Sequence, residues 1–129
     1  MNDVVLDASA LIALLKDEPG AAKVADSIAS SRMSAVNYAE VVSHFIHAGM
    51  PAQEVDAMLR PLPMTIVGAD ADLACVAGRL RAVTAAAGLS LGDRFCLALA
   101  LRDALPAITA DRQWGAVSDT VGATILVIR

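Results

Sequence analysis

A short aliphatic run near the amino terminus, Val4-Val5-Leu6, ends at Asp7, directly before a segment that favours a helix. Runs of this kind are typical of a strand that is buried on both faces of a parallel sheet. A carboxylate directly after such a strand is poorly placed unless something pairs with it. Because ligands bind at the carboxyl edge of open parallel α/β sheets, Asp7 predicts a functional site at that edge.

Strand-like and helix-like segments alternate along the chain. The predicted strands are Val4–Leu6, Arg32–Ser34, Met64–Val67, Ala107–Thr109 and Thr124–Ile128. The predicted helices are Ala8–Lys16, Ala21–Ser30, a helix capped by Ser34 that runs to about His47, Pro51–Pro61, a helix capped by Asp70 or Asp72 that runs to Ala87, a helix capped by Ser90 that covers Leu91–Ala104, and a short piece around Trp114. This alternation predicts an α/β fold with a parallel sheet and helices on both of its faces.

Length and composition predict the number of domains, the cellular compartment and the oligomeric state. A chain of 129 residues predicts one domain over residues 1–129. Charged residues interrupt the apolar runs before the roughly 20 residues that a membrane span requires, so we expect no membrane association. Asp3 and Asp7 lie where a signal peptide would be basic and then apolar, which predicts a cytoplasmic protein. The 57% apolar content, with one Trp, one Tyr and two Phe, predicts that part of the surface is buried in a homodimer.

Four acidic residues fall at strand exits or early in the helices that follow: Asp7, Glu40, Asp93 and Asp111. In a parallel sheet these positions converge on one edge. Two unit charges about 4 Å apart repel by roughly 4 kcal/mol at an effective dielectric constant near 20, so such convergence needs a counter-ion. Mg²⁺ or Mn²⁺ takes oxygen ligands and keeps a positive face toward phosphate. The net charge of −4 offers no attraction to nucleic acid, so an RNA partner requires bridging cations.

Each acid also has a structural interpretation that remains open at this stage. Asp93 stands three residues after Ser90, the spacing of a capping box, and Asp111 is placed to cap the helical piece near Trp114. For Glu40 the structural interpretation is a side chain that faces solvent. Against it, the amide of Asn37, one turn earlier on the same helical face, is placed to orient the Glu40 carboxylate.

Other polar and sulfur groups carry weaker signals. Glu40, His44 and His47 share a helical face, but their spacing matches no hydrolytic zinc site, and we expect a polar outer face. Cys75 and Cys96 form no Cys-x-x-Cys pair and fall among alanines and leucines, which predicts buried free thiols in a reducing compartment.

The motifs together resemble the PIN-domain ribonucleases, and among them the VapC toxins of bacterial toxin–antitoxin pairs. The resemblance rests on Asp7-Ala-Ser-Ala, on Ser34 through Glu40, on Asp93 within Leu-Gly-Asp-Arg-Phe and on Thr109-Ala-Asp-Arg-Gln-Trp. It implies a five-stranded parallel sheet of order 3-2-1-4-5, an acidic quartet formed by the four carboxylates, and Mg²⁺- or Mn²⁺-dependent cleavage of RNA. It also implies a homodimer and an antitoxin that inhibits the enzyme. Some relatives carry a further acid beside the fourth one, whereas Gln113 and Trp114 follow Asp111 here, so Asp111 is expected as an outer or second-metal ligand.

The predicted mechanism is hydrolysis by a metal-activated water, which leaves a 5′-phosphate and a 3′-hydroxyl. Ser9, Asn37 and Thr109 are expected to hold the carboxylates in place, and Arg94 and Arg112 to contact RNA phosphates.

Three alternatives compete with this hypothesis. The first is a degenerate PIN module that binds a metal or a protein partner without catalysis. A phosphatase of the haloacid-dehalogenase type normally needs an acid where Ser9 stands, and a receiver domain needs an aspartate after the third strand, where Met64 to Gly68 contains none.

Overall fold

Strand β1 (Val4–Leu6) lies at the centre of a five-stranded sheet in the computed structural model of the chain, which describes residues 3–129. The other strands are β2 (Ser31–Ser34), β3 (Thr65–Val67), β4 (Ala107–Thr109) and β5 (Ile125–Val127). They are ordered β3-β2-β1-β4-β5, and every neighbouring pair is parallel. The predicted α/β class, parallel sheet and strand order are confirmed.

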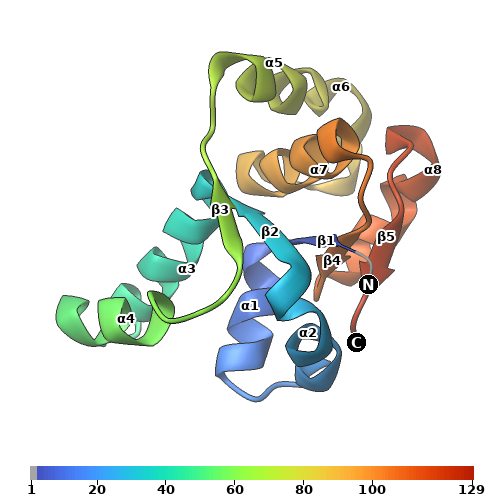
Figure 1. The fold of residues 1–129 in the computed structure, drawn as a ribbon. Helices are drawn as coiled ribbons and strands as arrows, with labels where there is room; N and C mark the ends of the chain where they lie inside the picture. The colour runs from blue at the N-terminus through green and yellow to red at the C-terminus, as the bar shows by residue number, and fades with distance from the viewer. Residues whose placement is uncertain (1–2) are drawn as a thin grey trace.

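Helices cover both faces of this sheet (Figure 1). One face carries α1 (Ala8–Leu15), α2 (Ala21–Ser27), the 3₁₀ turn η1 (Ile28–Ser30), α3 (Ala35–His47) and α4 (Ala52–Leu59). The other carries α5 (Ala71–Arg79), α6 (Arg81–Thr84), η2 (Ala85–Ala87), α7 (Leu91–Asp103), η3 (Arg112–Val117) and α8 (Ser118–Val121). The sheet is thus the middle layer of three.

The side chains of β1 alternate between two hydrophobic cores. Val4 and Leu6 pack into the core beneath α1 and α3, whereas Val5 packs into the core beneath α5 and α7. All three are buried, and Val5 and Leu6 have 0% exposure. Because strand side chains point alternately to opposite faces, this pattern fixes the register of the central strand and therefore the direction in which Asp7 leaves it.

The predicted helix starts are confirmed where a side-chain cap is present. Ser34 accepts a hydrogen bond from the main-chain N–H of Asn37, and Asp70, rather than Asp72, accepts one from Leu73. Ser90 and Asp93 form a complete capping box at the start of α7. Each such cap satisfies main-chain donors that the first turn leaves without partners.

Two predicted helices are interrupted. The segment expected as one helix to Ala87 is divided into α5, α6 and η2, and the segment expected to reach Ser30 ends its α-helical part at Ser27. In the first case the carbonyl oxygen of Leu80, at the junction of α5 and α6, accepts from the hydroxyl of the buried Thr84 at 2.8 Å and from the main-chain N–H of Thr84 at 3.1 Å.

The two cysteines lie in different environments. Cys96 is buried in α7, as predicted, whereas Cys75 is exposed on α5, so the prediction of a buried thiol is wrong for Cys75. The reason is helical periodicity: Leu73 and Ala77 occupy the inward face of α5, and Cys75 lies between them on the opposite side. Across residues 3–129, no helix is both long and apolar enough to cross a membrane.

Helix α7 provides a test of this layered core. Leu97 is fully buried there, while Leu91 at the start of the same helix is 56% exposed. We expect Leu97→Ala to lower the free energy of unfolding by about 2–5 kcal/mol, because it leaves a cavity between α7 and the sheet. The matched change Leu91→Ala should stay within about 0.5 kcal/mol. Urea denaturation measures both, and equal losses would contradict the assigned burial.

Candidate active site

The four acidic residues meet at the carboxyl edge of the sheet. Asp7 follows β1, Glu40 lies on α3, Asp93 lies in the first turn of α7, and Asp111 follows β4. They are close enough to influence one another electrostatically: the charges of Asp93 and Glu40 raise the pKa of Asp7, and the charge of Asp111 raises that of Asp93. The structure therefore brings all four predicted carboxylates into one cluster.

Asp7 is the most buried member of the cluster, with 3% exposure. It occupies the N-cap position of α1 but makes no side-chain cap hydrogen bond. Its Oδ2 instead accepts hydrogen bonds from the hydroxyls of Ser9 at 2.6 Å and Thr109 at 3.0 Å. Among residues 3–129, its Oδ1 accepts no hydrogen bond. The Asp7 carboxylate is therefore held by Ser9 and Thr109 and contributes no side-chain cap to α1.

Burial raises the pKa of Asp7 to about 7, and the neighbouring charges of Asp93 and Glu40 add to this effect, while the hydrogen bonds from Ser9 and Thr109 oppose it. The ionised carboxylate is thus destabilised in the folded chain by lack of solvent and by like charges. A bound cation would reverse both effects.

Ser9 and Thr109 tie the exits of the two central strands together. The Ser9 hydroxyl oxygen accepts from the main-chain N–H of Ala110 at 3.0 Å, and that of Thr109 accepts from the N–H of Asp111 at 3.0 Å. Both hydroxyls then donate to Asp7. This places Ser9 and Thr109 where the sequence predicted them, as groups that orient the Asp7 carboxylate.

Glu40 is held by a network between α3 and α7. The fully buried Asn37 donates from Nδ2 to Glu40 Oε1 at 2.8 Å and to the carbonyl oxygen of Gly92 at 2.9 Å, and its own Oδ1 accepts from Ser34 Oγ. The expected hydrogen bond between Asn37 and Glu40 is therefore present. Burial is the main cause that raises the pKa of Glu40.

Gly92 is the residue that allows Glu40 to reach the cluster. A Cβ built on Gly92 would overlap the carboxylate of Glu40, so no other residue type leaves that space. Sequence reasoning missed Gly92, although a glycine in the first turn of a helix, beside the acid Asp93, was an available signal.

Asp93 serves the helix as well as the cluster. Its Oδ2 accepts a hydrogen bond from the main-chain N–H of Ser90 at 2.8 Å, which completes the capping box. Burial raises its pKa, while the hydrogen bonds with Ser90 and the charge of Arg94 lower it. Within the described chain its Oδ1 accepts no hydrogen bond, so capping leaves one oxygen available to a ligand.

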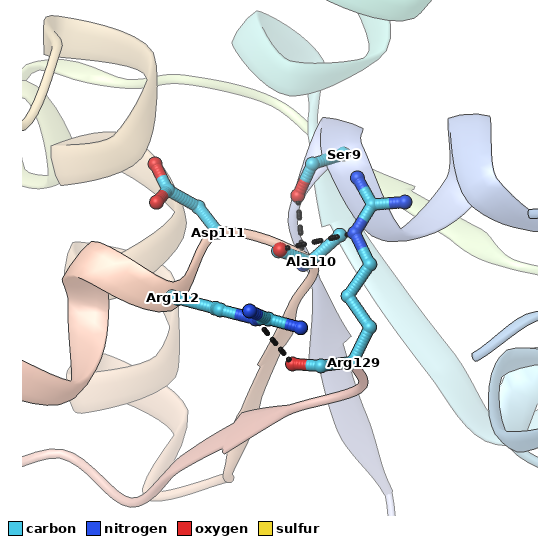
Figure 2. A pocket seen from close by; sticks show the side chains of 5 residues that line it. All are labelled: Ser9, Ala110, Asp111, Arg112 and Arg129. Atoms are coloured by element: carbon cyan, nitrogen blue, oxygen red, sulfur yellow. Dashed lines mark hydrogen bonds between the residues drawn. The ribbon is translucent and has the colours of Figure 1, made fainter. Parts of the chain in front are cut away.

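Asp111 combines a cap with a place beside a depression of about 430 Å³ (Figure 2). Its Oδ1 accepts from the main-chain N–H of Gln113 at 2.9 Å, the cap that its sequence position suggested. The depression is also lined by Ser9, Ala110, Arg112 and Arg129. Arg129 was not among the predicted site residues, because only the placement of β5 brings it here.

The two predicted arginines differ in their surroundings. Arg94 donates from Nε to Thr84 Oγ1 at 3.2 Å and from Nη2 to the carbonyl oxygen of Leu89 at 3.0 Å, so it braces the chain before α7. Arg112 is exposed and lines the depression beside Asp111. Of the two, Arg112 is the one that lines this depression.

A cysteine and two histidines lie near the acidic cluster. Cys96 is fully buried behind the acids, and burial, followed by the charges of Asp7, Asp93 and Glu40, raises the pKa of its thiol well above the usual value. The thiol is therefore kept protonated and unreactive. His44 and His47 are exposed and line an open groove along α3 with Glu40.

The donor set fits a hard divalent cation in its chemistry. Carboxylate oxygens are the ligands that Mg²⁺ and Mn²⁺ prefer, and Mg²⁺ commonly takes only one or two carboxylates while keeping several waters. In the part of the chain that is described, no three His, Cys, Asp or Glu side chains stand arranged to hold one metal ion. Asp7 with Glu40 or Asp93 is the pair that suits such a sparse ligand set.

Comparison with known proteins gives a family and a fold. A family model for the PIN domain matches residues 4–119. Among curated proteins, none matches the chain.

Three of the similar solved structures illustrate the likeness. The chain is similar to a toxin–antitoxin complex from Klebsiella pneumoniae, with 19% identity, a TM-score of 0.73 and 98% of each chain covered. It is also similar to DNA-bound VapBC from Salmonella typhimurium, with 15% identity, a TM-score of 0.75 and 100% of each chain covered. VapC20 from Mycobacterium tuberculosis, a sarcin-ricin loop cleaving toxin, has 16% identity and a TM-score of 0.71, covering 88% of this chain and 94% of that one. At identities this low the likeness shows the fold.

The raised pKa of Asp7 predicts how stability depends on pH in metal-free buffer. Folded Asp7 keeps its proton up to about pH 7, whereas the unfolded chain loses it near 3.8, so the folded state binds more protons in this window. The free energy of unfolding should therefore fall by roughly 2–3 kcal/mol between pH 5 and pH 7, because a difference of one bound proton changes it by about 1.4 kcal/mol for each pH unit. Asp7→Asn should remove most of this fall.

Urea denaturation in EDTA at pH 5 and pH 8 measures the effect. Asp26→Asn, an exposed aspartate on α2, is the matched control and should keep the wild-type dependence. If Asp7→Asn showed the same fall as wild type, Asp7 would not carry the buried charge described here.

Proposed function

This chain belongs to the PIN-domain family, and on that premise we propose that it is a metal-dependent endoribonuclease, the toxin component of a toxin–antitoxin module. The observation that carries the proposal is the buried carboxylate of Asp7, fixed through one oxygen by two hydroxyls and surrounded by like charges. Such an arrangement costs stability unless a cation binds. A carboxylate that only capped α1 would need neither feature, so this arrangement supports a cation-binding role for Asp7.

The roles of the residues follow from their contacts. Asp7, with Glu40 or Asp93, would hold Mg²⁺ or Mn²⁺ directly. The other of these two acids would contact the ion through water, and Asp111 would be an outer or second-metal ligand. When bound, the cation supplies a Lewis acid that lowers the pKa of water and offsets charge on a phosphodiester. Ser9 and Thr109 orient Asp7, and Asn37 orients Glu40, so that the oxygens do not need to reorganise during the reaction.

The partners belong to the same proposal. Several structural neighbours are described as toxin–antitoxin or VapBC structures. This supports the proposal that an antitoxin binds this chain and inhibits its activity. The proposed assembly is a homodimer, as the family resemblance implies, and the 57% apolar content of the chain is consistent with it. RNA is the proposed substrate, and the cytoplasm the proposed location.

A second candidate is a degenerate PIN module that binds a partner without catalysis. Two observations favour it: Asp93 and Asp111 both serve as helix caps, and no three side chains of metal-binding type in residues 3–129 stand ready around one point. The two candidates differ in one property, the cleavage of RNA.

Incubation of the purified chain with a structured RNA and Mn²⁺ distinguishes the nuclease from the non-catalytic module. We expect cleavage by wild type, loss of cleavage in EDTA, and a fall of about a hundredfold or more in Asp7→Asn and Asp93→Asn, because each removes a charged ligand oxygen. The products should carry 5′-phosphates, which a phosphate-dependent exonuclease detects. Equal cleavage by all three proteins would indicate a contaminant, and no cleavage by wild type would support the non-catalytic module.

Gly92 gives a sharper test that separates function from stability. Gly92→Ala should displace the Glu40 carboxylate, which lies at the end of a flexible side chain, and so lower the cleavage rate by about tenfold or more. Thermal stability should not fall, because alanine favours a helix over glycine by up to about 1 kcal/mol.

Gly78→Ala on α5 is the matched control, since an added Cβ there meets no atom within 4 Å. It should gain stability and keep full activity. If Gly92→Ala cleaved RNA as fast as Gly78→Ala, the placement of Glu40 beside Gly92 would not matter for the reaction.

A further inference from the structure

A depression beside the acidic cluster is bordered by two arginines from distant parts of the chain. Arg112 comes from the start of η3 and Arg129 follows β5, and with Ser9, Ala110 and Asp111 they line a space of about 430 Å³ (Figure 2). Ser9 also donates to Asp7, and Asp111 influences Asp93. The depression therefore includes Asp111 and reaches Asp7 through Ser9.

Both guanidinium groups are held by their Nε atoms. Arg112 Nε donates to the carbonyl oxygen of Arg129 at 3.1 Å, and Arg129 Nε donates to the carbonyl oxygen of Ala110 at 3.4 Å. Neither Nη atom of Arg112 donates to any group within residues 3–129, and Arg129 uses only Nη1, toward Glu18 Oε1 at 3.4 Å. The terminal nitrogens, which bind phosphate as a fork, thus remain largely available.

Within residues 3–129, the Asp111 carboxylate lines the depression without forming an ion pair with either arginine. Figure 2 shows the Asp111 carboxylate pointing away from both guanidinium groups, while the Arg129 side chain extends past Ala110 on the side where Ser9 lies. Asp111 Oδ1 accepts from the N–H of Gln113, which explains this direction. The chain as a whole, with a net charge of −4, does not attract RNA, but these two arginines provide local positive charge that can bind an RNA phosphate.

We propose that Arg112 and Arg129 bind a backbone phosphate of the RNA strand adjacent to the phosphate that is cleaved. This inference rests on the nuclease function proposed above and adds Arg129 as a positioning residue for the substrate. Contacts to phosphate set the register of a strand and do not read its bases, so this subsite acts on RNA of any sequence. The ion pair of Arg129 with Glu18 opens or is shared when the phosphate binds.

Cleavage kinetics and RNA binding test the proposal. Arg112→Ala and Arg129→Ala should each raise KM about fivefold and change kcat by less than about twofold, because each arginine holds the phosphate equally before and during the reaction. In EDTA, anisotropy of a fluorescent single-stranded RNA should show weaker binding, with a salt dependence of log K shallower by about 0.7 for each arginine–phosphate pair removed. Arg112→Lys and Arg129→Lys, which keep the charge but not the fork, should lie between alanine and wild type.

Arg60→Ala is the matched control, because Arg60 is an exposed arginine at the end of α4 that pairs only with Asp56. If Arg129→Ala and Arg112→Ala matched this control in KM and in salt dependence while wild type cleaves RNA, the subsite would be refuted and the nuclease function would stand. A fall in kcat at unchanged KM would also refute it. If wild type does not cleave RNA but binds it through these arginines, the subsite stands and the nuclease function fails; if it neither cleaves nor binds, both fail.

Discussion

The burial of one negative charge at the end of the central strand is the constraint on which the site depends. Val4, Val5 and Leu6 fill both cores, and their register forces Asp7 out of β1 at the carboxyl edge with 3% exposure. An aspartate in that position would normally cap the following helix, which stabilises a protein by about 1 kcal/mol. Here the carboxyl group accepts hydrogen bonds from Ser9 and Thr109 instead. The fold therefore lacks that cap and holds a buried carboxyl group whose pKa is raised to about 7.

The remaining acids join Asp7 through contacts between layers. Asn37 on α3 bonds both to Glu40 and to the main chain of α7, and Gly92 leaves the space into which the Glu40 carboxylate fits. Asp93 enters the cluster from the same turn of α7 while completing its cap. These groups lie on helices that pack against the two hydrophobic cores and not on long loops, so core packing fixes where they stand. Residues of the proposed site therefore also contribute to the fold, and the capping roles of Asp93 and Asp111 are compatible with the roles proposed for them.

Local sequence patterns predicted the features that depend on neighbours in the chain. The alternation of strands and helices, with the serine caps, indicated the α/β fold. The positions of the four acids after the predicted strands indicated that they converge on one edge. The strand order came from the family resemblance. Features that depend on residues far apart in the chain were not predictable. The carbonyl oxygen of Gly92 accepts a hydrogen bond from Asn37, which is 55 residues away, and Arg129 reaches the site only because β5 pairs with β4. The exposure of Cys75 depended on which face of α5 packs inward.

Anomalous diffraction from a crystal grown with Mn²⁺ would locate the proposed cation without reference to activity, and so it tests the role of the buried Asp7 charge itself. We expect a peak at the carboxyl edge of the sheet, ligated by Asp7 and by Glu40 or Asp93, with water completing the coordination. A well-ordered crystal with no peak among these carboxylates, and with the Asp7 carboxyl hydrogen-bonded only to Ser9 and Thr109, would contradict that role.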